Sequence, residues 1–145
     1  FDSWAGLALG KDAYNHYVAP HNTRLFDALK PTGVPLINFS TGTFPYLEDV
    51  ATCGGDVIAV DFRMPLGAAW EKIGFERAIQ GNLDPAGLFA PWEVLKLQVD
   101  RVLAEAAGRP GHIFNLGHGL HKTTPVDSVK RLVDYVHRST KEFEV

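Results

Sequence analysis

The sequence has very little cysteine and no long apolar run. Cys53 is the only cysteine among 145 residues, which excludes an intramolecular disulfide framework and a zinc site built on two or more thiolates. No apolar stretch approaches the roughly 18 residues that a membrane-spanning helix needs. A single cysteine suits a reducing cytosol, so we expect a cytoplasmic protein that does not span a membrane.

Neither sign of charge is in large excess. The chain carries 14 Lys and Arg against 17 Asp and Glu, a formal net charge of −3. Without a basic footprint, a nucleic-acid partner is not expected. Hydrophobic residues make up 46% and charged residues 21%, which is typical of a globular domain. The abrupt start at Phe1, without the regions of a signal peptide, predicts that further sequence precedes it.

Strand-like and helical segments alternate along the chain. Apolar runs predict strands over 34–39, 56–61, 76–81 and 112–117, and helical spacing predicts helices over 12–29, 45–53, 66–74, 91–107 and 125–141. Pro20 lies inside the first helical pattern and predicts a kink or a restart there, because proline removes an intrahelical donor. Each strand run is nearly continuous rather than alternating, which indicates parallel strands covered on both faces.

Polar and glycine-rich residues follow every predicted strand. They are NFSTGT (38–43), VDFR (60–63), QGNLDP (80–85) and NLGHG (115–119). Enzymes with a (β/α)8 barrel carry their chemistry on these loops, whereas an open doubly wound sheet would be marked by G-x-G-x-x-G or a P-loop, and neither is present. A complete barrel needs about 250 residues. We therefore interpret residues 1–145 as one α/β domain, the C-terminal half of a (β/α)8 TIM-type barrel with parallel strands.

The NLGHG segment is the most suggestive functional candidate. The glycines beside His118 permit unusual backbone angles and a close approach to a ligand, and an imidazole at a strand end would point into the barrel mouth. The alternative is a histidine satisfied by a loop carbonyl. His118 and His121, with His112 nearby, also suggest a metal site; they lie in a glycine turn without an acidic or cysteine partner, so no metal is predicted.

Three further polar residues at strand ends are weaker candidates. Gln80 and Asn82 are placed to donate hydrogen bonds from the floor of a cleft, while Asp84 is expected to cap the short helix that follows it. Asp61 is either a carboxylate at the barrel mouth or the ion-pair partner of Arg63.

Three segments in their order along the chain carry a family resemblance: FDSWAG (1–6), QGNLDP (80–85) and GHIFNLGHG (111–119). Together they resemble the uroporphyrinogen decarboxylases. The resemblance implies a (β/α)8 barrel, a homodimer and a carboxy-lyase that uses no metal or organic cofactor. Its substrate would be the tetrapyrrole uroporphyrinogen, whose acetate side chains lose their carboxyl groups to give coproporphyrinogen in heme biosynthesis. Ser3 then maps to the family's substrate-contacting serine and His118 to the histidine that lines its pocket, so the resemblance implies that both bind substrate and that His118 is also catalytic.

The resemblance also implies that the family's arginines, its aspartate and its tyrosine lie outside residues 1–145, so this chain alone is expected to be inactive. Two alternatives stay open. A zinc-dependent corrinoid methyltransferase shares the barrel but needs His-x-Cys after a strand, where this sequence has Asn38-Phe39-Ser40. The other is a half-barrel that binds a tetrapyrrole or a partner without catalysis, whose strand edges and uncovered inner face predict self-association.

Overall fold

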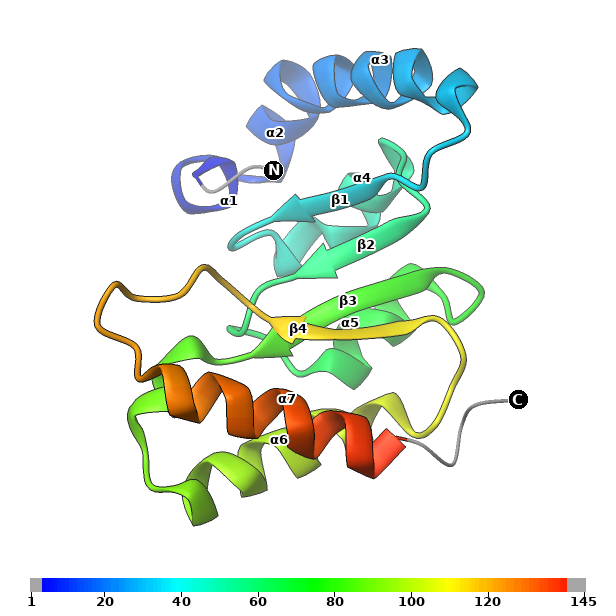
Figure 1. Cartoon of the computed structure of the whole chain (residues 1–145). Helices are drawn as coiled ribbons and strands as arrows, with labels where there is room; N and C mark the ends of the chain where they lie inside the picture. The colour runs from blue at the N-terminus through cyan, green and yellow to red at the C-terminus, as the bar shows by residue number, and fades with distance from the viewer. Residues whose placement is uncertain (1–3, 141–145) are drawn as a thin grey trace.

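A single four-stranded sheet organises the chain. The computed structural model describes residues 4–140, with the strands β1 (Ile37–Ser40), β2 (Val57–Val60), β3 (Ala78–Leu83) and β4 (His112–Leu116) (Figure 1). They lie in chain order β1-β2-β3-β4, and every pair is parallel. The predicted α/β class, four consecutive units of a half barrel, is confirmed.

Helices connect the strands and precede the sheet. They are α1 (Ala5–Ala8), α2 (Lys11–Tyr17), α3 (Ala19–Leu29), α4 (Leu47–Thr52), α5 (Leu66–Ile73), α6 (Trp92–Ala106) and α7 (Val126–Thr140), with short 3-10 turns η1 (Lys30–Thr32), η2 (Phe44–Tyr46) and η3 (Pro85–Phe89). The helix predicted over 12–29 restarts at Ala19, with Pro20 in the first turn of the new helix, where a missing N–H costs nothing. The predicted restart is therefore confirmed.

The third strand lies two residues further along the chain than its apolar run predicts. It spans Ala78–Leu83 rather than 76–81, because pairing with β4 continues through Asn82↔Asn115 and Leu83↔Leu116. Four of the six residues of the QGNLDP segment are therefore strand rather than loop. The correction matters for the site, since it places Asn82 inside the sheet instead of on a loop.

The core lies on one face of the sheet only. Figure 1 shows α4 and α5 behind the strands, with α6 and α7 alongside them. Ile58 and Ile79 point to this side and are fully buried with Trp70, Leu95 and Val99. Burying apolar side chains of this size contributes about 1.5–3 kcal/mol each, so this cluster holds the helices against the strands.

The opposite, inner face of the sheet is open to solvent in part, since Ala59 is 2% exposed at its centre while residues of the outer strands are exposed. Phe39, Ala59, Gln80 and Ile113 are paired in register and form one row across all four strands. Ile37 is 46% and Ile113 42% exposed. Within residues 4–140 no helix lies over this face (Figure 1), as expected of a half-barrel, and coverage of both faces stays a prediction for the full-length protein.

The first helix reaches the sheet at the carboxyl end of β1. A Cβ on Gly6 would lie 2.1 Å from the carbonyl oxygen of Thr41, so only glycine allows α1 to approach this loop so closely. None of the helices within residues 4–140 is long and apolar enough to cross a membrane.

Candidate functional site

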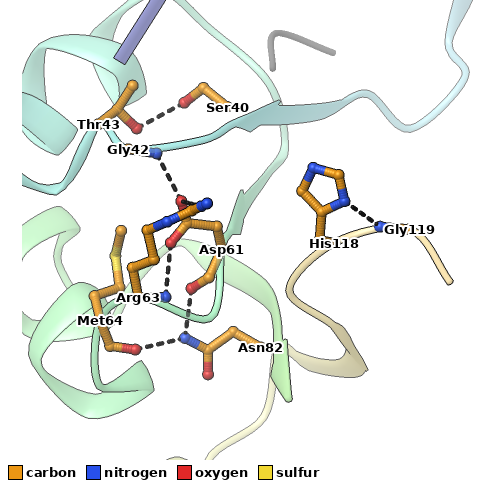
Figure 2. Close-up of polar contacts among 9 residues, drawn as sticks. All are labelled: Ser40, Gly42, Thr43, Asp61, Arg63, Met64, Asn82, His118 and Gly119. Atoms are coloured by element: carbon orange, nitrogen blue, oxygen red, sulfur yellow. Dashed lines mark hydrogen bonds and ion pairs between the residues drawn. The ribbon is translucent and has the colours of Figure 1, made fainter. Parts of the chain in front are cut away.

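The four loops predicted to carry chemistry meet at one edge of the sheet. Each follows the carboxyl end of a strand, and parallel strands end on the same side. Neighbouring loops are joined by hydrogen bonds, several of them centred on Asp61 (Figure 2). The loops therefore form one connected rim rather than four independent segments.

Asp61 is the centre of this connected rim. Its side chain is fully buried. The Gly42 amide (2.6 Å) and the Arg63 guanidinium (3.0 Å) donate to Oδ2, and the Arg63 amide donates to Oδ1 at 2.8 Å. Both oxygens are occupied by protein donors, as a buried carboxylate requires. Of the two readings of Asp61, the geometry favours the ion pair with Arg63, and it adds a link to the β1 loop that the sequence did not suggest.

Asn82 is also committed to the protein. It is 5% exposed, and its Nδ2 donates to the carbonyls of Asp61 (2.8 Å) and Met64 (2.7 Å). Both hydrogens of the amide group are thereby used. This arrangement favours a structural role, since no side-chain donor of Asn82 remains for a substrate.

Gly117, the glycine before His118, is required by close packing between two loops rather than by unusual backbone angles. A Cβ on Gly117 would lie 2.2 Å from the Phe62 amide nitrogen, and the Gly117 amide donates to the Leu83 carbonyl at 2.8 Å. Gly117 therefore brings the β4 loop against the backbone of the β2 loop. Neither Gly117 nor Gly119 has a positive φ, so the prediction of unusual backbone angles is wrong.

His118 is exposed and stands apart from the Asp61 cluster in Figure 2. The backbone amide of Gly119 donates to its Nδ1 at 2.8 Å. Because a backbone amide can only donate, Nδ1 carries the lone pair and the neutral ring holds its hydrogen on Nε2. His118 therefore presents an N–H donor at the rim, which suits a carboxylate or another acceptor.

His118 lines a hollow on the inner face of the sheet. This inner hollow, of about 520 Å³, is bounded by Phe39, Ala59, Gln80 and Asn115 on the strands and by residues 118–120 on the loop. Within the described residues the side-chain amide of Gln80 makes no hydrogen bond. The side-chain oxygen Oδ1 of Asn115 accepts only from the backbone amide of Leu116, at 2.8 Å. Gln80 and His118 are thus brought together as predicted, with Asn115 as a polar neighbour that the sequence did not single out.

A second hollow lies outside the first, between the loops after β2, β3 and β4. This rim hollow, of about 540 Å³, is lined by Phe62, Arg63, residues 84–86, Phe89 and residues 118–121. His118 stands on the wall between the two hollows, because it lines both. Asp84 caps the start of η3 at this edge, where its Oδ1 accepts from the Ala86 amide at 2.9 Å, as predicted.

The three histidines considered for a metal are not gathered. His112 begins β4 and His118 follows its end. Burial lowers the pKa of His112, and the hydrogen bond between its Nε2 and the Gly81 carbonyl, at 2.9 Å, opposes that shift only in part. Among residues 4–140, no group of three or more His, Cys, Asp or Glu is placed to hold a metal ion. Ser3 lies outside the described residues.

The chain is similar to decarboxylases over nearly its whole length. The family model described as uroporphyrinogen decarboxylase (URO-D) matches residues 1–139. A protein from Carboxydothermus hydrogenoformans named uroporphyrinogen decarboxylase is 53% identical over 94% of this chain and 39% of its own length. Relatives of the same name from Sorangium cellulosum and Salinispora tropica are 51% and 49% identical. The chain thus spans about two fifths of the length of these relatives.

A solved structure shares the arrangement of strands and helices. A methyltransferase from Methanosarcina mazei matches with a TM-score of 0.79 and covers 96% of this chain and 41% of its own. Its sequence identity is 18%, so the match shows the fold alone.

Proposed function

The chain belongs to the uroporphyrinogen decarboxylase family, and from that premise we propose that it is the C-terminal half of a barrel enzyme that decarboxylates uroporphyrinogen. The observation that carries the proposal is the family match over residues 1–139. The rim geometry supports it, since a donor histidine stands beside an open hollow at the strand ends. The homodimer, the cytoplasmic location and the absence of a cofactor stay predictions.

The reaction needs an electron sink and a water-poor pocket rather than a cofactor. Protonation of a pyrrole carbon makes the ring electron-poor, so the electrons left by the departing carbon dioxide are delocalised in the pyrrole. The protein must hold a polyanion, stabilise the transient positive ring and deliver protons. Asp61, the buried carboxylate of this rim, is fully engaged by backbone and arginine donors, so it is not proposed as a proton donor.

His118 serves substrate binding in this proposal. Its Nε2–H donates to a carboxylate or a pyrrole-side acceptor, and Gln80 offers an amide donor from the floor of the inner hollow. Ser3, carried over by resemblance, is proposed as a second substrate contact. A neutral imidazole with its hydrogen on Nε2 donates a hydrogen bond without becoming charged. We therefore assign His118 the role of orienting a reacting group of the substrate.

The test uses the full-length protein that carries this chain. With uroporphyrinogen as substrate, carbon dioxide and coproporphyrinogen are the expected products, and their absence would refute the function. His118→Asn moves the donor to the Nδ1 side of the ring and should lower turnover about tenfold or more, or change the distribution of partly decarboxylated intermediates. His118→Gln keeps a donor near the Nε2 position and should retain more activity. Stoichiometric uptake of added zinc would instead favour the methyltransferase alternative.

Stability separates the binding role of His118 from a structural one. The side chain is exposed, and its one hydrogen bond within the described residues is to the next amide. Both variants should therefore melt within a few degrees of the wild type. A large loss of stability with normal activity per folded molecule would assign His118 to the structure instead.

A further inference from the structure

Arg63 is a cation at the rim that the proposed function has not used. Its Nη1 pairs with Asp61 at 3.0 Å, and the guanidinium carbon lies 4.7 Å from the centre of the Phe62 ring. The side chain is 45% exposed and lines the rim hollow. Within residues 4–140 no other acid pairs with it, so the rest of the guanidinium fork remains available. A fork held on one side by a buried carboxylate is fixed in direction before any ligand arrives.

The two histidines of the rim hollow, His118 and His121, are also donors. The Nδ1 of His121 lies 2.8 Å from the Thr123 hydroxyl and accepts from the Thr123 amide at 3.3 Å. Because the amide can only donate, this contact favours a neutral ring with its hydrogen on Nε2, as in His118. The His121 ring is packed edge-on against Phe89, 6.1 Å between centres. The carboxylate on the wall is that of Asp84, and its Oδ1 accepts from the Ala86 amide.

The walls between these donors are apolar. Phe62, Pro85, Phe89 and Leu120 make up much of the lining. A free inorganic anion would gain little from such walls, whereas a carboxylate carried on an apolar ring would bury its stem against them while the arginine fork takes both oxygens.

We propose that the rim hollow is a carboxylate-binding subsite in which Arg63 takes one side-chain carboxylate of the tetrapyrrole, aided by the Nε2–H of His121. This inference rests on the proposed function, which supplies a polycarboxylate substrate. Asp61 acts on the same subsite as a positioning residue, because it holds the guanidinium that binds.

The experiment compares Arg63→Gln with Arg138→Gln in the full-length protein. Arg138 is exposed in the last turn of α7. In Figure 1 this C-terminal, red end of α7 lies at the opposite end of the sheet from the arrowheads of the strands. The two variants change the net charge equally. Loss of a charge-assisted pair should raise the KM for uroporphyrinogen about tenfold in Arg63→Gln, and Arg138→Gln should leave it unchanged.

The identity of the bound carboxylate follows from the product pattern. If Arg63 holds a carboxylate that stays on coproporphyrinogen, the variant slows every decarboxylation step equally and no intermediate accumulates. If it holds a reacting acetate, one partly decarboxylated intermediate accumulates. Both patterns support the subsite.

Arg63→Lys is the control for a folding defect in Arg63→Gln. The lysine keeps the charge beside Asp61 but loses the planar fork, so it should melt like the wild type and still raise KM. The subsite is refuted if both folded Arg63 variants keep KM within about twofold of the wild type. If the wild-type protein releases no carbon dioxide, the proposed function fails separately, and equilibrium binding of the porphyrin octacarboxylate, followed by fluorescence, still shows whether Arg63 binds carboxylate.

Discussion

Replacing Asn82 with alanine tests whether this residue holds the rim together or touches substrate. Its Nδ2 is shared between the Asp61 and Met64 carbonyls, at 2.8 and 2.7 Å, in a site that is 5% exposed. Each hydrogen bond contributes about 1 kcal/mol net, and a buried carbonyl left without a donor adds to the cost. We expect Asn82→Ala to lower the free energy of unfolding by about 2–3 kcal/mol.

Urea unfolding of the full-length protein measures the loss, and decarboxylation per folded molecule is measured on the same samples. Gln80→Ala is the matched control, because Gln80 is two residues away on the same strand and faces the inner hollow. That variant should change the free energy of unfolding by less than about 1 kcal/mol and raise the KM. If Asn82→Ala unfolds like the wild type but raises the KM, then Asn82 binds substrate and the structural assignment is refuted.

Two further predictions concern the outer helices and the open face. Burial alone would raise the pKa of Asp100, but hydrogen bonds from Lys96 and Tyr135 outweigh it and hold the pKa below its ordinary value of 3.8. The resulting contribution to stability is present above pH 3.8 and is lost as the pH falls through the lower pKa that Asp100 has in the folded state. Tyr135→Phe should therefore make the free energy of unfolding depend less on pH in this acid range. An unaltered pH dependence would contradict this prediction. Residues 1–145 expressed alone should self-associate on size exclusion and release no carbon dioxide, because Ile37 and Ile113 are exposed on the sheet. A monomer that unfolds cooperatively would count against that.

The order of strands and helices was predictable from the sequence because it depends on local pattern. Apolar runs and a proline located the four strands and the restart at Ala19. The end of β3 could not be predicted from the sequence. Its last residues are extended by the pairing of Leu83 with Leu116 on β4 rather than by their own strand propensity.

The site was predictable in part for a similar reason. His118 and Gln80 both follow from their places at strand ends, and both line the inner hollow. The structural roles of Asp61 and Asn82 could not be predicted, because they depend on contacts between segments that are distant in the sequence. Asp61 binds the Gly42 amide across 19 positions of sequence, and Asn82 reaches Asp61 across 21. Such contacts leave no periodic signal in one sequence.

Full engagement of Asp61 has a consequence for how this rim can evolve or be redesigned. The carboxylate and the carbonyl of Asp61 tie together three segments: the loop after β1, the loop after β2 and the end of β3. Changes to any one of these segments should therefore be non-additive with changes to the others, and double-mutant cycles between them should show coupling of about 0.5–3 kcal/mol. Libraries that vary the three segments around an intact Asp61 should retain more folded members than libraries that vary Asp61 as well.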